Sequence, residues 1–211
     1  MFLYVCIICC SSIYQSYSLC DECELKLIRF GFINNNKIEL QYPRNCWCNN
    51  LCTEKCYGID SYILYKYELN IRKLILQFKY GERADLGIFF AKQTEYMCLP
   101  KIFIPIPSTY WREVQRGYNP AMLLCEELQK IHGGVIFDVL YKDSFVNQGK
   151  SNSEERFNNS QSIKCKDYND IINKSVLIVD DTIASGSTIK RAIELLKPFI
   201  KNISIFAIAK T

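Results

Sequence analysis

Short apolar runs alternate, from residue 61 onward, with segments whose apolar side chains recur every three or four residues. Near-continuous apolar runs that are separated by amphipathic helices are typical of a mainly parallel sheet with helices on both faces. The pattern therefore predicts an α/β domain. Its strands are expected at residues 61–68, 102–106, 135–140, 176–180 and 203–209.

Three helices are predicted between the first three strands. Asn70 is expected to cap the first, whose apolar positions fall on one face, and residues 82–97 to form the second. Asn119 followed by Pro120 is typical of a capped helix with proline at its first position. That third helix ends at His132, where a histidine suits the carboxyl end of a helix better than it suits catalysis.

The first 60 residues contain nine of the twelve cysteines, and eight of the nine form close pairs. Two residues between thiolates let a tight turn direct both sulfurs at one ion, and two such turns complete a tetrahedron. The first two pairs therefore predict a zinc site, in which Cys10 could replace Cys9. The irregular spacing of the other two leaves open a second zinc ion or four spare thiols. The pairs are Cys6 with Cys9, Cys20 with Cys23, Cys46 with Cys48, and Cys52 with Cys56.

A disulfide framework in a secreted module is the alternative for these cysteines. The apolar start MFLYVCIICC has no preceding basic residue and no clear cleavage site, so no signal peptide is expected. Thiols stay reduced in the cytosol, which favours zinc. Because no stretch approaches the roughly 18 apolar residues of a membrane helix, we expect a soluble, cytoplasmic protein.

Composition and charge exclude only a few classes of protein and of function. Of the 211 residues, 49% are apolar and 23% charged, which excludes wholesale disorder. The length suits a small zinc module at residues 1–60 and one α/β domain at residues 61–211. The module has a net charge of −1 and the remainder +5, which permits an anionic ligand without demanding nucleic acid. The single histidine, His132, argues against a Ser-His-Asp triad.

The segment VLIVDDTIASGSTIKRAIELLK carries the most specific signal. A buried strand delivers Asp180 and Asp181 at its carboxyl end, a loop follows at residues 182–187, and a helix begins at Thr188. Ligands of parallel sheets bind where strands end and helices begin, and helix amino termini suit phosphate. Gly186 lets the backbone approach such a ligand closely. The two acids suit ribose hydroxyls or a metal, so the segment predicts a phosphate-sugar site. Its hydroxyl donors are Ser185, Ser187 and Thr188.

Residues 180–188 resemble the phosphoribosyl-diphosphate (PRPP) signature of type I phosphoribosyltransferases. Several further motifs, in their order along nearly the whole chain, resemble the ComF family in particular. They are the paired cysteines, RKLILQFKYGER at residues 72–83, IPIPSTYWREVQRGYNPA at residues 104–121, and Gln148 followed by residues 155–158. Two positions depart from the family pattern: Ala184 replaces a usual threonine and Pro120 a frequent glutamine.

This resemblance implies a PRPP site with magnesium, in which Asp180 and Asp181 hold the ribose hydroxyls. It also implies a mobile hood at residues 142–170 over that site. The residues implied to bind PRPP are Asp180, Asp181, Thr182, Ala184, Ser185, Gly186, Ser187 and Thr188. The residues implied to contact pyrophosphate or nucleic acid are Arg112, Arg116, Lys150 and Arg156.

ComF-like proteins are associated with natural transformation, so the resemblance implies a PRPP-binding protein that serves DNA uptake. Single-stranded DNA would need stacking platforms, for which Trp111 and Tyr118 beside two arginines are the candidates. One alternative is an active phosphoribosyltransferase of nucleotide metabolism, in which an unknown nitrogen nucleophile displaces pyrophosphate. Another is a scaffold whose zinc module docks a helicase or pore protein, which would tolerate Asp180→Asn with Asp181→Asn.

Overall fold

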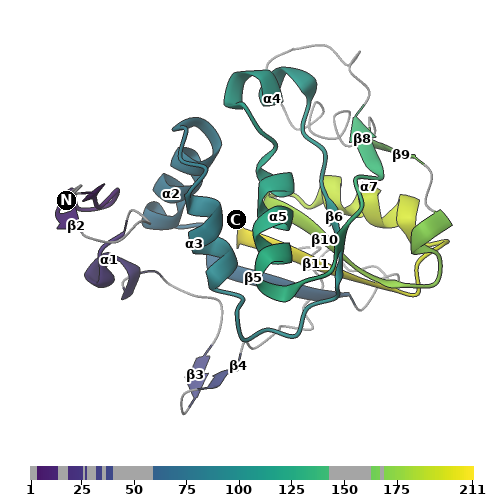
Figure 1. Cartoon of the computed structure of the whole chain (residues 1–211), viewed down its shortest axis with the longest axis horizontal. Coiled ribbons are helices and arrows are strands. Elements are labelled where there is room, and N and C mark those ends of the chain that lie inside the picture. The colour runs from purple at the N-terminus through teal and green to yellow at the C-terminus, as the bar shows by residue number, and fades with distance from the viewer. Residues whose placement is uncertain are drawn as a thin grey trace.

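The computed structural model describes residues 4–13, 19–25, 27, 32–34, 37–39, 59–142, 163–166 and 169–211 (Figure 1). Its centre is a five-stranded parallel sheet in the order β5-β11-β10-β6-β7, which confirms the predicted α/β architecture. The strands are β5 (Asp60–Lys66), β6 (Ile102–Pro105), β7 (Val135–Ile136), β10 (Ser175–Ile183) and β11 (Asn202–Lys210).

Helices cover both faces of this sheet because the central strands are apolar on both sides. In β10, Leu177 and Val179 belong to one buried cluster, whereas Val176 and Ile178 belong to the other. Helices α2 (Leu69–Tyr80), α3 (Leu86–Lys92) and α5 (Pro120–His132) contribute to the first cluster. Helix α7 (Ser187–Leu196) contributes to the second.

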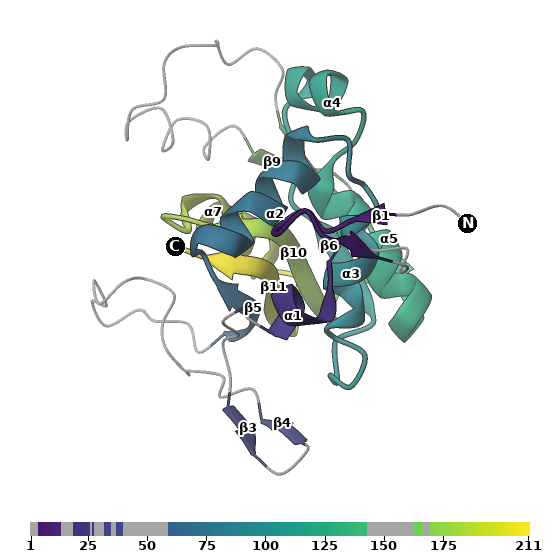
Figure 2. The same cartoon turned by 90° about the vertical axis from the view of Figure 1, so that its left-hand side faces the viewer.

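Smaller elements surround this core. These smaller elements are β1 (Tyr4–Val5), β2 (Ser12–Ile13), α1 (Asp21–Leu25), β3 (Phe32–Asn34), β4 (Lys37–Glu39), α4 (Tyr110–Arg116), β8 (Leu140–Lys142), β9 (Ile163–Cys165) and a 3-10 helix (Asn169–Ile171). The segment that contains β1, β2 and α1 packs on α2 and α3, since Leu19 and Leu27 are buried in the same cluster as those helices (Figure 2). None of the helices in the described ranges is long and apolar enough to cross a membrane.

The predicted helix boundaries are right in part. The Asn119 side chain accepts a hydrogen bond from the Ala121 backbone N–H at 3.0 Å, which confirms it as the cap of α5. The prediction for Asn70 is wrong, because α2 begins one residue earlier and Glu68 precedes it without a side-chain cap. His132 ends α5 as predicted, with Nε2 lying 2.8 Å from the Thr94 hydroxyl.

Three segments differ from the predicted pattern. Only Leu86–Lys92 of the helix expected at residues 82–97 is α-helical. The single strand expected at residues 135–140 is two strands: β7 ends the main sheet, whereas β8 pairs with β9 in a separate antiparallel pair. Helix α4 was not expected, because it buries no side chain and so lacks an apolar period.

Candidate functional site

The two adjacent acids predicted to bind a sugar line a cavity at the carboxyl end of β10. The cavity has a volume of about 360 Å³, and its wall includes Asp180, Asp181 and the loop that leads into α7. Strand β10 continues to Ile183 and so includes the first two residues of the predicted loop, which places both carboxyl groups within the strand. All eight residues implied by the resemblance to bind PRPP line it: Asp180, Asp181, Thr182, Ala184, Ser185, Gly186, Ser187 and Thr188.

The loop after β10 turns through a left-handed glycine into the amino terminus of α7. Gly186 has φ 73°, a conformation that a residue with a side chain rarely adopts, and it immediately precedes Ser187. The hydroxyl oxygens of Ser185 and Ser187 lie 3.1 Å apart, and the Ser187 N–H is 3.4 Å from the Ser185 hydroxyl. This loop thus collects hydroxyl and backbone donors at a helix amino terminus, which suits a phosphate group.

Lys79 forms the closest charged contact of the site. Its Nζ donates to Asp181 Oδ1 at 2.7 Å and to the Thr182 hydroxyl at 2.6 Å. The Thr182 hydroxyl in turn donates to the same Asp181 oxygen at 2.6 Å. The lysine comes from the last turn of α2, about a hundred residues earlier in the chain, and was not predicted as a site residue.

Arg112 and Arg116 both line the cavity from α4. The Arg116 guanidinium lies 4.5 Å from the centre of the Tyr80 ring and donates to its hydroxyl at 2.7 Å. Lys142, at the end of β8, adds a further cation that was not predicted individually. Arg112 and Arg116 thus lie on the cavity wall, while Lys150 and Arg156 lie outside the described residues.

Burial perturbs two ionisable groups of the cavity in opposite directions. Burial first, and then the Asp181 carboxylate, raise the pKa of Asp180 to about 7, although Lys79 opposes the shift. Burial lowers the pKa of Lys142, while Asp180 partly restores it. Asp180 therefore changes its protonation near neutral pH, which is unusual for a carboxyl group.

Four of the amino-terminal cysteines lie together. The Sγ atoms of Cys6, Cys9, Cys20 and Cys23 are all within 4.8 Å of one another, and could hold a metal ion. Cys9 Sγ lies 3.6 Å from Cys20 Sγ, which is close to the distance of about 3.8 Å between two sulfur atoms of a tetrahedral zinc–thiolate site. A hydrogen bond to the Ser11 hydroxyl is the main cause that lowers the pKa of Cys9 to about 6. Cys10 does not belong to the cluster.

The other predictions for cysteines are tested only in part. The eight described cysteines form no disulfide bond. Cys46, Cys48, Cys52 and Cys56, the second predicted quartet, lie outside the described residues. Both Cys6 and Cys23 are buried in the apolar cluster that contains α2 and α3. The cysteine cluster is therefore packed onto the α/β domain.

The aromatic residues proposed as stacking platforms have different surroundings. Trp111 is 61% exposed on α4, and its ring centre lies 5.7 Å from that of Tyr110 in an edge-on arrangement. Tyr118 packs instead against Phe78, with 5.9 Å between ring centres, and its hydroxyl donates to the Phe78 carbonyl. Tyr110 and Trp111 thus form the exposed aromatic pair, whereas Tyr118 is a packing residue.

Comparison with known proteins finds one family model and several solved structures that are similar to this chain. Residues 115–206 match the family model described as "Phosphoribosyl transferase domain". The chain is similar to the solved structure of the allosteric regulatory enzyme of purine biosynthesis, with a TM-score of 0.42 and 15% identity, over 63% of this chain and 30% of that one. It is also similar to purine phosphoribosyltransferase from Pyrococcus horikoshii, with a TM-score of 0.37 and 19% identity, over 72% and 87% of the two chains.

Two relatives match over nearly the full length. Competence protein F of Haemophilus influenzae is 26% identical over 228 residues, which cover 99% of this chain and 98% of the relative. Competence protein ComFC of Streptococcus pneumoniae is 24% identical over 202 residues, which cover 91% and 87%. The predicted resemblance to the ComF family is thus confirmed: the chain is similar over nearly its full length to two competence proteins, a segment of it matches the phosphoribosyltransferase domain, and an amino-terminal cysteine cluster precedes that segment.

Proposed function

We propose that this protein binds PRPP with magnesium in the cavity at the end of β10 and serves DNA uptake in natural transformation. The observation that carries the proposal is that paired carboxyl groups and a hydroxyl-rich helix amino terminus line one cavity. The hydroxyls of a ribose suit the carboxylates, and a 5′-phosphate suits the loop. The role in DNA uptake is supported by the two competence proteins to which the chain is similar.

Structural zinc belongs to the same proposal. The fit rests on an all-thiolate donor set whose Sγ atoms lie within 4.8 Å of one another. Such sites are tetrahedral and closed, so zinc would supply folding free energy and no chemistry. The four cysteines hold it, while Leu19 and Leu27 attach the module to α2 and α3.

Calorimetric titration of PRPP into the wild-type protein, with magnesium present, tests the ligand directly. We expect one site per chain and a rise in melting temperature, since a ligand that binds only the folded state stabilises it. The matched control is a titration with magnesium alone. Absence of both heat and stabilisation would contradict PRPP binding.

Single-stranded DNA is the proposed partner of the exposed aromatic pair, Tyr110 and Trp111. The arginines that line the cavity come from the same helix, so stacking and phosphate contacts lie close together. This surface is proposed for the DNA that such a protein would handle during uptake.

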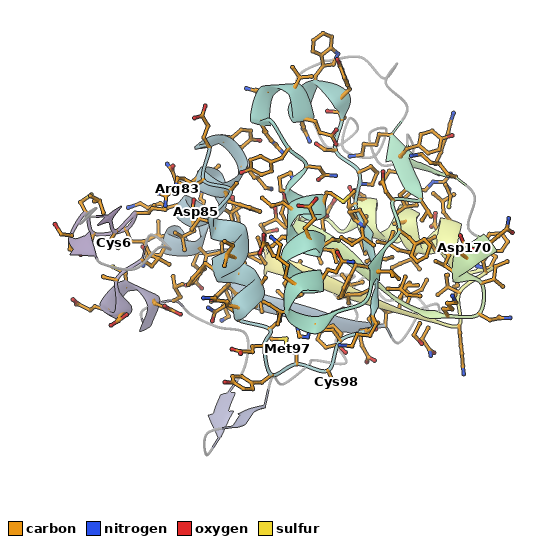
Figure 3. The ribbon with its side chains drawn as sticks, in the orientation of Figure 1. Cys6, Arg83, Asp85, Met97, Cys98 and Asp170 are labelled. Carbon is orange, nitrogen blue, oxygen red and sulfur yellow. The ribbon has the colours of Figure 1, made fainter. Side chains whose placement is uncertain are left out.

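Trp111→Ala is expected to weaken binding of a single-stranded oligonucleotide about tenfold, because stacking contributes substantially for each base. Fluorescence anisotropy measures the affinity, which should fall steeply between about 50 and about 200 mM salt. Tyr96→Ala is the matched control, because Tyr96 is 88% exposed. It directly precedes Met97 and Cys98, which lie at the opposite end of the molecule from α4 (Figure 3). Equal effects of the two variants would contradict the proposed surface.

A further inference from the structure

Lys79 forms an ion pair with Asp181, one of the two acids at which the proposed function places a sugar. Oδ1 of Asp181 accepts from both Lys79 at 2.7 Å and Thr182 at 2.6 Å. The two partners are well shielded, with side-chain exposures of 18% for Lys79 and 12% for Asp181. A contact between charges that are this shielded from water is stronger than one on the surface. A ribose that uses this carboxylate must therefore compete with the lysine.

The charge lining the cavity is predominantly positive. Among the described residues of its wall, four are basic and two acidic, so pairing Lys79 with Asp181 leaves an excess of positive charge. This excess suits a ligand with more than one anionic group. The basic residues are Lys79, Arg112, Arg116 and Lys142, and the acidic ones are Asp180 and Asp181.

The α2 helix continues through Lys79 and ends with a hydrogen bond of 2.8 Å from the Gly81 N–H to the Gln77 carbonyl, so the lysine side chain can change partner without a change in the helix backbone. The side chain of Tyr80, the next residue, accepts a hydrogen bond of 2.7 Å from Arg116. Beyond the turn, Arg83 and Asp85 form two parallel hydrogen bonds of 2.8 and 2.7 Å, and both are labelled in Figure 3. A lysine is a flexible stem with a compact charge, which allows it to reach different anions from one backbone position.

We propose that Lys79 is a specificity-determining residue, which leaves Asp181 for the pyrophosphate of PRPP and so makes the site prefer PRPP to ribose 5-phosphate. The inference rests on the proposed function. Both sugars offer hydroxyls to Asp181 and a 5′-phosphate to the loop after β10. Only PRPP offers a second anion that replaces the carboxylate as the partner of Lys79. Ribose 5-phosphate must either leave this lysine in place or separate it from Asp181 without compensation.

The test compares the affinities of PRPP and ribose 5-phosphate for the wild type and for Lys79→Met, by calorimetry with magnesium. We expect PRPP to bind about tenfold more weakly to the variant, because a charge-assisted contact is lost. Ribose 5-phosphate should bind unchanged or more tightly, because its hydroxyls no longer compete. The preference for PRPP therefore falls about tenfold, and this ratio is a quantity that a purely structural role of Lys79 would not change.

Three further variants make the result specific. Lys73→Met removes an exposed lysine of the same helix that does not line the cavity, and should leave both affinities unchanged. Lys79→Arg should retain the preference, because it keeps the charge. Lys79→Gln should lose it, and provides the same comparison should Lys79→Met not fold.

The outcomes separate this inference from the proposed function. The wild type could bind PRPP while the Lys79 variants bind both sugars equally more weakly, or bind both with unchanged affinity. In that case the specificity role of Lys79 is wrong and the proposed PRPP site stands. If the wild type does not bind PRPP, the proposed function fails and the inference fails with it. A fall in preference confined to the variants without a positive charge at position 79 supports both.

Discussion

Replacing Asp180 and Asp181 together by asparagine is expected to weaken PRPP binding by about a hundredfold or more. Each carboxylate accepts hydrogen bonds from sugar hydroxyls more strongly than a neutral amide oxygen does, and two such contacts are lost. Calorimetric titration of PRPP with magnesium into wild type and double variant measures the loss. The scaffold hypothesis, in which the cavity has no ligand, expects no difference in any function of the protein.

Asp170→Asn is the matched control for this pair. Asp170 is an exposed carboxyl group in the 3-10 helix and does not line the cavity, so its removal should leave PRPP affinity unchanged (Figure 3). The double variant should also remain folded. Because the pKa of Asp180 is raised in the folded protein, its ionisation reduces stability as the pH rises toward 7, and asparagine removes that penalty. Unchanged PRPP affinity in the double variant would contradict the proposed site.

The raised pKa of Asp180, about 7, gives wild-type binding a characteristic pH dependence. The ionised form accepts hydrogen bonds from the ribose, and its fraction rises roughly tenfold between about pH 6 and about pH 8. Affinity should therefore increase over this range by up to that factor. In the variant Asp180→Asn the increase in affinity should be smaller. The pH dependence that remains is due to ionisation of the phosphate groups of the ligand.

Cys23→Ser is expected to remove one metal ion per chain and to lower the melting temperature by on the order of 10 °C. Cys23 is 5% exposed. Together with Leu19 and Leu27, it belongs to the apolar cluster that also contains residues of α2 and α3. Loss of the metal should therefore release these apolar side chains as well as the antiparallel pair β1–β2. Elemental analysis by mass spectrometry measures the metal, and differential scanning calorimetry the transition.

Cys10→Ser is the matched control for the cysteine cluster. Cys10 is exposed, lies next to a cluster member in sequence and is not part of the cluster, so its loss should leave metal content unchanged. This control also decides between Cys9 and Cys10 as the ligand, which the spacing alone left open. Equal metal loss in both variants would contradict the ligand set, and an unchanged metal content in Cys23→Ser would contradict the site.

The strand and loop at residues 176–188 could be predicted because their signal is local. Apolar runs predict buried strands, and the adjacent acids and hydroxyls follow directly in the chain, so their common cavity needs no distant partner. Helices α2 and α5 were predictable for the same reason, since each has an apolar face and α5 has a local cap. Helix α4 has neither a buried face nor a side-chain cap, and nothing local distinguished it from a loop.

The cysteine cluster shows how much can be predicted from spacing alone. The two pairs with two intervening residues predict one metal site of Cys6, Cys9, Cys20 and Cys23, and their sulfur atoms lie together in the structure. The attachment of this module to α2 and α3 depends on Leu19 and Leu27, which have no periodic pattern of their own. Packing between segments that are far apart in sequence has no local signature.

By itself, the amino-acid sequence determined the parallel α/β architecture, the acidic strand end with its hydroxyl-rich loop, and the four-cysteine cluster, because each is encoded within a short segment. Only the tertiary structure decided which cations face the acids. Lys79 reaches Asp181 from α2, and Lys142 reaches the same cavity from β8. Their positions depend on how α2 and β8 pack around the sheet, and no periodicity or spacing in one segment specifies a contact across a hundred residues.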